Sequence, residues 1–166
     1  MIRFAAATAA AVPFALCIAV PAHAADVLAT HRVSAALANE AVGAAVASCA
    51  KQGYAETAVL VDADGVTQAS LRGDTAGIHT FDSAHDKAYT SVTFKSDTGA
   101  LVERAKTTTI ATLTSKLPHL LLFQGGLVIK IGDEVVGAIG ASGAPGGNLD
   151  EACAKAGLDA IRDRLK

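Results

Sequence analysis

Two apolar runs in the second half of the chain carry the clearest hydrophobic pattern. They cover residues 127–131 and 135–139 and flank the pair Gly132-Asp133. β-Branched runs separated by a two-residue Gly/Asp turn predict a β-hairpin, because both turn positions tolerate positive φ. Residues 120–124 are a candidate for a further short strand just before this hairpin.

The same stretch is unusually rich in glycine. Glycine weakens a strand, so repeated glycine indicates that something approaches the backbone closely. A packed helix, a second subunit or a ligand would each satisfy this expectation. The glycines concerned are Gly125, Gly126, Gly137, Gly140, Gly143, Gly146 and Gly147.

Helical periodicity predicts a helix at each end of the chain. From residue 27 to about 52, small or apolar side chains recur at three- and four-residue steps, and Gly53 follows as a C-cap residue. The last helix is expected over residues 149–165, with Asn148 as a side-chain cap and acidic residues in its first turn.

Between these helices the pattern alternates between strands, turns and helices. The threonine-rich run 107–116 fits either a helix or an extended segment. The other predicted elements are a strand over 57–62, a turn at Asp64-Gly65, a returning strand over 66–71, a helix over 81–94 and a short helix over 99–106. This order is neither alternating βαβ nor all-β. It predicts an α+β fold in which an antiparallel sheet is covered by the N- and C-terminal helices.

The start of the chain predicts a secretory signal peptide over residues 1–24. Arg3 supplies a positive charge, residues 4–20 are apolar, and small residues lead up to a cleavage site after Ala24. The modest length of the run argues against a membrane anchor. We therefore expect residues 25–166 to form a single exported domain, periplasmic or secreted, with no membrane attachment after cleavage.

Charge excludes one class of partner. The chain has 14 Lys and Arg against 16 Asp and Glu, a formal net charge of −2, and no basic run. Nucleic acid is therefore an unfavourable partner.

The cysteines predict a disulfide between Cys49 and Cys153. Cys17 lies within the predicted signal peptide, so two cysteines remain in an oxidising destination. Cys49 lies in the last turn of the first helix and Cys153 in the first turn of the last, where neighbouring antiparallel helices would bring them together. Two buried thiols are the alternative.

Three segments carry a family resemblance. They are GGL-I-----VVGAIGASGAPGG--DEACAKAGL over residues 125–158, VDADG over 61–65 and AHDKAYTSVTF over 84–94. In this order they resemble the GlcG/HbpS-like family of small haem-binding proteins, which includes the C-terminal domain of PduO-type adenosyltransferases. The resemblance implies a profilin-like arrangement, haem as the ligand and assembly into a homo-oligomer.

Histidines are the first candidates for a binding site. No two of them have His-x-x-x-His spacing, and the cysteines lack a Cys-x-x-Cys partner, so we expect no dedicated zinc site. One histidine would suffice as an axial ligand to haem iron. His79 is favoured as this metal ligand because it lies in a predicted loop, and His85 is second because Tyr89 shares its helical face.

Lys87 is the lysine of the family's Lys-Ala motif. It would pair with a ligand carboxylate such as a haem propionate, or instead bond helix-end carbonyls or a buried acid. Arg72 and Asp74 are candidates for the same polar cluster.

No nucleophile, base and orienting residue can be assembled from the sequence, which disfavours an enzyme. The function expected is that of an exported protein that binds a small molecule, with haem implied by the resemblance. An enzyme acting on haem or on a small organic acid is one alternative. A non-catalytic, self-assembling scaffold is another.

Overall fold

The computed structural model describes residues 28–166, so the predicted signal peptide lies outside the described residues. In chain order the elements are α1 (Ala35–Ala50), β1 (Thr57–Asp62), β2 (Thr67–Arg72), α2 (His79–Phe94), α3 (Thr98–Ala105), α4 (Ile110–Thr114), β3 (Gly126–Ile131), β4 (Glu134–Ser142), α5 (Gly147–Ile161) and the 3-10 helix η1 (Arg162–Arg164). None of the helices in this part of the chain is both long and apolar enough to cross a bilayer.

The first helix begins later than its periodicity predicts. Ser34 has extended backbone, and its hydroxyl accepts a hydrogen bond from the amide of Leu37, so α1 starts at Ala35 and not at residue 27. Arg32, just before this cap, binds the carboxylates of Asp62 and Asp64 at 2.6 and 2.5 Å. The segment before α1 is therefore held against the β1–β2 turn.

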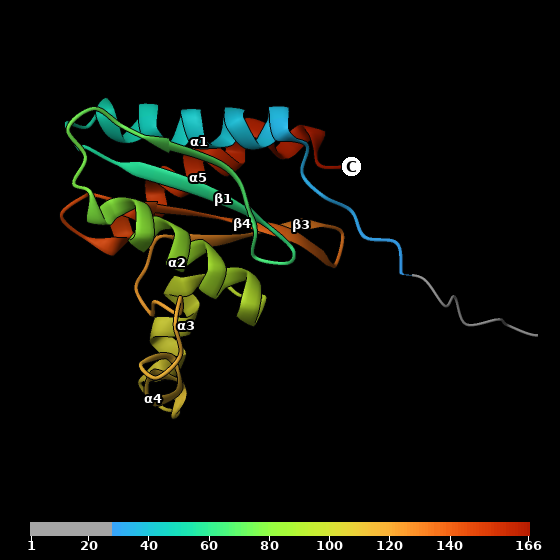
Figure 1. The fold of residues 1–166 in the computed structure, drawn as a ribbon, viewed down its shortest axis with the longest axis vertical. Coiled ribbons are helices and arrows are strands. Elements are labelled where there is room, and N and C mark those ends of the chain that lie inside the picture. The colour runs from blue at the N-terminus through green and yellow to red at the C-terminus, as the bar shows by residue number, and fades with distance from the viewer. Residues whose placement is uncertain (1–27) are drawn as a thin grey trace, which may run out of the picture.

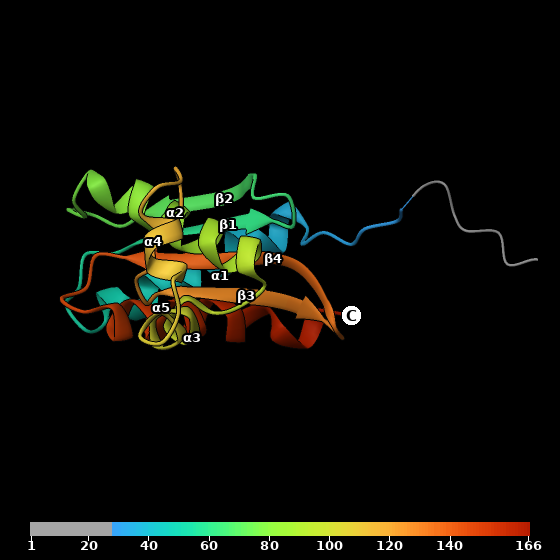
Figure 2. The same cartoon turned by 90° about the horizontal axis from the view of Figure 1, so that it is seen from below.

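The four strands form one antiparallel sheet in the order β2-β1-β4-β3 (Figure 2). Both predicted hairpins are present, β1–β2 with Gly65 at φ +81° and β3–β4 with Gly132 at φ +58°. All six residues of β1 are buried, because this strand is central and covered on both faces. The predicted α+β class with an antiparallel sheet is confirmed.

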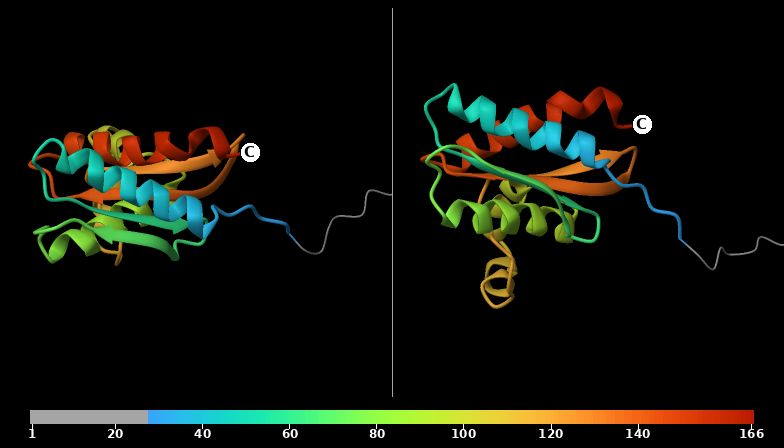
Figure 3. Two further views of the ribbon diagram at one scale, coloured as in Figure 1. Left: turned by 90° about the horizontal axis from the view of Figure 1, so that it is seen from above. Right: turned by 45° about the horizontal axis from the view of Figure 1, so that its top comes forward.

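Helices cover both faces of the sheet (Figure 1). The terminal helices α1 and α5 lie side by side on one face, as predicted (Figure 3). Their core is large and apolar. On the other face α2 packs over β1 and β4 through a small core of Val59, Val61, Ala84, Ala88, Val92 and Ala138.

The strand glycines make room for α2. A Cβ atom placed on Gly140 would collide with the carbonyl oxygen of Ala84, and one placed on Gly126 with that of Lys87. Both carbonyls belong to α2. Of the three explanations that the sequence allowed, a packed helix of the same chain therefore accounts for these two glycines.

Two local predictions around the second hairpin are wrong. Residues 120–124 form no strand, and α5 has no side-chain cap hydrogen bond, since it begins at Gly147 after Gly146. The run 107–116 contains the single turn of helix α4, which together with α3 projects below α2 in Figure 1.

The disulfide between Cys49 and Cys153 is confirmed, with the two Cα atoms 5.6 Å apart. It joins the end of α1 to the first half of α5, as the antiparallel arrangement of these helices allows. The bond closes a separation of 104 residues. On a chain-entropy estimate it stabilises the domain by up to about 4–5 kcal/mol.

Candidate functional site

A buried ion pair joins α2 to α5. The Lys87 ammonium donates to the Asp150 carboxylate at 2.5 Å and to the carbonyl oxygen of Ala141 in β4 at 2.9 Å. The two charged side chains are only 2% and 4% exposed. Lys87 therefore does bond a buried acid, as one of the two interpretations of the sequence required. These bonds use two of its three donors.

Asp150 is held from both sides. Its second carboxylate oxygen accepts a hydrogen bond from the amide of Ala144 at 2.9 Å. A Cβ atom on Gly125 would lie 2.9 Å from both the Lys87 ammonium and the Asp150 Cβ, and Gly125 has φ +123°. Glycine at this position therefore lets the chain pass directly over the ion pair.

A second carboxyl group, that of Glu56, lies close to the ion pair. Burial, and next the nearby Asp150 carboxylate, raise the pKa of Glu56 to about 8. Its Oε2 lies 3.2 Å from Cys49 Sγ, and its Oε1 is buried without a hydrogen-bond partner among the described residues. Glu56 is therefore largely protonated at neutral pH.

Both residues of the ion pair line a cavity of about 460 Å³. Hydroxyl groups form one wall, where Ser83 donates to Ser142 at 2.7 Å. Phe123, 52% exposed, forms an apolar wall with its ring centre 5.2 Å from the Lys87 ammonium. The full lining is Ala55, Thr75, Gly77, His79, Thr80, Ser83, Lys87, Leu121, Phe123, Ser142, Gly143, Ala144 and Asp150.

His79 lines this cavity but does not lie in a loop. It is the first residue of α2, because the helix begins two residues earlier than the pattern of apolar positions indicated. The side chain is exposed and folds back over Gly77, where a Cβ atom would meet the imidazole at 2.7 Å. The sequence thus placed His79 beside the Lys87 helix correctly but assigned its backbone wrongly.

The remaining predicted site residues lie elsewhere. Arg72 lines a different cavity and donates its Nε to the carbonyl oxygen of Ala76 at 2.7 Å. His85 and Tyr89 do share a helical face, with stacked rings 5.9 Å apart, but this face is turned toward His119. The five predicted binding residues are therefore divided among three places, and only His79 and Lys87 share a cavity.

Sequence reasoning missed three important residues of the site. The sequence marks Asp150 only as a helix-terminal acid, and it does not mark Glu56 or Phe123. One signal was present for Asp150, since it lies within the family-like segment 125–158. Nothing local marks the other two, because their roles come from contacts with distant elements.

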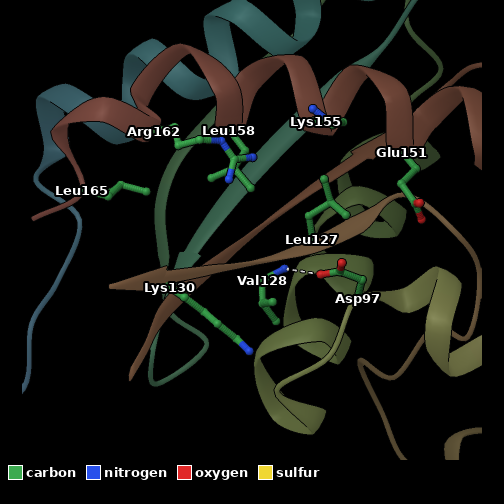
Figure 4. A pocket seen from close by; sticks show the side chains of 9 residues that line it. All are labelled: Asp97, Leu127, Val128, Lys130, Glu151, Lys155, Leu158, Arg162 and Leu165. Carbon is green, nitrogen blue, oxygen red and sulfur yellow. Dashed lines mark hydrogen bonds between the residues drawn. The ribbon is translucent and has the colours of Figure 1, made fainter. Parts of the chain in front are cut away.

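A larger cavity of about 560 Å³ lies between α5 and β3 (Figure 4). Two of its three basic side chains, Lys155 and Arg162, are already bound to Asp159 at 2.5 and 2.7 Å. Asp97 uses a carboxylate oxygen to accept from the amide of Val128 at 2.9 Å. None of the residues that line this cavity is a histidine or an aromatic residue, which makes it a weaker candidate than the Lys87 cavity.

A family model described as "Haem degrading protein HbpS-like" matches residues 33–159. The chain belongs to the HbpS-like family. This confirms the resemblance seen in the sequence. A crystal structure of a double mutant of Streptomyces reticuli HbpS is 33% identical, with a TM-score of 0.77, over 87% of this chain and 97% of that one.

Other solved members of the same fold are more distant in sequence. Klebsiella pneumoniae protein ORFY is 21% identical with a TM-score of 0.77, over 85% of this chain and 98% of that one. The protein in a PduOC:haem complex is 22% identical with a TM-score of 0.71, over 79% of this chain and 96% of that one. No curated protein matched the HbpS-like chain.

Proposed function

We propose that this chain binds haem in the Lys87 cavity and is an exported binding protein. The observation that carries the proposal is a buried ammonium group facing a cavity that also has an exposed phenylalanine and a histidine. An apolar wall with a few convergent polar groups is what a flat ligand with acidic side groups requires. Membership of the HbpS-like family and the fold shared with the protein of the PduOC:haem complex support it.

Each of these side chains has a role that suits its chemistry. His79 is exposed at the start of α2, and its imidazole would serve as the axial ligand to iron. The remaining donor of Lys87 would bond a propionate, with the other two donors fixing its position. Phe123 would cover part of the porphyrin face. When bound, haem would supply the redox-active iron of the site.

Titration of haem into the mature protein tests this proposal. His79→Ala should change the spin state of the bound iron, whereas Phe123→Ala should weaken haem binding about tenfold while the spin state is kept, because it removes apolar contact area. Matched controls are His31→Ala, an exposed histidine bound to Glu134, and Leu113→Ala, an exposed apolar residue of α4. Unchanged spectra and affinity for both site variants would place haem elsewhere.

An enzyme that degrades haem is the second candidate, and the description of the family model favours it. Haem-loaded protein should be incubated with a reductant and oxygen. Loss of the Soret band with formation of a ring-opened product at a rate that depends on His79 would show catalysis. A stable spectrum would indicate that the protein binds haem without degrading it.

The proposal also includes export and self-association. Cleavage after Ala24 would leave a chain beginning at Ala25. The disulfide suits an oxidising compartment. Intact-mass measurement of secreted material tests cleavage, and retention of Met1 would contradict it.

Self-association is supported by apolar side chains at the β2 edge and the start of α2. Val66, Leu71 and Phe81 are 61%, 43% and 40% exposed. We expect light scattering to give a homo-oligomer. A single species of monomer mass would contradict this part of the proposal.

A further inference from the structure

Two histidines and an aspartate meet beside α2, outside the proposed haem site. His85 and Asp86 are neighbours on α2, and His119 comes from the loop before β3. Oδ1 of Asp86 lies 3.0 Å from Nδ1 of His85 and 3.2 Å from Nδ1 of His119. One ligand atom from each of the three side chains lies within 4.8 Å of the other two.

We propose that His85, Asp86 and His119 bind a divalent first-row transition metal such as Zn²⁺. Metal–ligand bonds of about 2.0–2.1 Å in a tetrahedral arrangement separate the ligand atoms by about 3.4 Å. The separations from Asp86 are within a few tenths of an ångström of this value. Imidazole and carboxylate together form a ligand set suited to Zn²⁺ and Fe²⁺.

The site leaves a coordination position open. Three protein ligands are one fewer than the four of closed structural zinc sites. His85, Asp86 and His119 line a cavity of about 450 Å³ together with Thr67, Phe81 and Asp82. Asp82, one helical turn before Asp86, places a second carboxylate in this cavity, where it would act on a metal-bound water.

The two imidazole rings are already positioned by their surroundings. The Tyr89 ring centre lies 5.9 Å from that of His85 and 6.0 Å from that of His119. Tyr89 in turn packs against the β1–β2 turn, since a Cβ atom on Gly65 would meet its ring at 2.7 Å. Side chains fixed in this way lose less conformational entropy on binding a metal.

This site is separate from the haem cavity. His79 and Lys87 line that cavity, whereas His85 and Asp86 line this one, and the two sets share no lining residue. The spacing rules that predicted no zinc site do not detect it, because His119 is 33 residues beyond Asp86. Only the fold brings the loop before β3 against α2.

The test is calorimetric titration of Zn²⁺ into untagged, haem-free protein. Wild type should bind one ion per chain, and Co²⁺ in its place should give the visible d–d absorption of a site with nitrogen and oxygen ligands. His85→Ala and His119→Asn should each weaken binding more than tenfold. Asparagine is chosen for position 119 because the backbone there has φ +62°, which asparagine tolerates well.

Two histidines outside the cluster provide controls. His31→Ala removes an exposed histidine that is paired with Glu134, and His79→Ala removes the proposed haem ligand. Both variants should bind Zn²⁺ as wild type does, and circular dichroism should show that every variant is folded. Absence of stoichiometric binding by wild type, or unchanged binding by the folded His119→Asn variant, would overturn the metal site and leave a hydrogen-bonded cluster only.

Discussion

The two faces of the sheet differ in the residues that pack against them. The face under α1 and α5 has a large apolar core and the disulfide. The face under α2 has a small core, close glycine contacts and buried polar groups that include Lys87. The first face supplies stability, because it buries apolar surface and carries a cross-link that restricts the unfolded chain. On the second face, a buried charge pair and cavities reduce the stability of the domain.

Removing the disulfide should have the largest effect on stability and should spare the chemistry of α2. The double variant Cys49→Ala, Cys153→Ala is expected to lower the free energy of unfolding by up to about 4–5 kcal/mol. Urea unfolding measures the loss. Haem and Zn²⁺ binding should persist at a temperature where the variant is folded, since neither proposed site includes a cysteine. Coupled loss of binding in a folded variant would contradict the division between the faces.

Breaking the buried ion pair should lower the free energy of unfolding by nearly as much, about 3–5 kcal/mol. Asp150→Ala leaves the Lys87 ammonium buried with only the carbonyl oxygen of Ala141 as a partner. The matched control is Asp159→Ala, whose carboxylate pairs with Lys155 and Arg162 on the surface and should matter by less than about 1 kcal/mol. Equal losses for the two variants would show that Lys87 finds water or another acceptor.

A methyl group added under α2 should cost about 1–3 kcal/mol. In Gly140→Ala the new Cβ meets the backbone of α2 at Ala84 and Ala88, which cannot move without shifting the helix. Gly43→Ala in α1 is the control, because nothing lies within 4 Å of a Cβ there. It should stabilise the helix by about 0.5–1 kcal/mol. Thermal unfolding compares the two, and stabilisation by both changes would contradict the close approach of α2.

The smallest effect at neutral pH is expected from Glu56→Gln, because Glu56 is already largely protonated there. Burial raises the pKa of Glu56 from 4.5 to about 8. The folded state therefore binds the proton more tightly than the unfolded state. The stability that this proton contributes is complete below the unfolded pKa and is lost as the pH rises through about 8.

Melting temperatures between about pH 4.5 and 9 would measure this dependence on pH. In Glu56→Gln the melting temperature should fall less steeply with rising pH, because the contribution of Glu56 is absent. Glu103→Gln, at a surface glutamate that is paired with Lys106, should keep it. An identical pH profile for Glu56→Gln and wild type would remove Glu56 from the titrating cluster.

Much of the molecule follows from local pattern. The two hairpins, the helix around Lys87 and the terminal helices were predicted from alternation, periodicity and turn residues. The disulfide followed from the count of cysteines and their positions on the two terminal helices. Such features depend on residues a few positions apart, so the amino-acid sequence contains that information directly.

The sites depended on the tertiary structure. The sequence singled out His79 and, through the family resemblance, Lys87, but it did not show which acid Lys87 bonds. That partner is Asp150, which is 63 residues away. In the same way, Asp86 meets His119 only because the loop before β3 folds back onto α2. Burial, pKa and shared coordination arise from which distant groups the packing brings together, so they are properties of the folded chain.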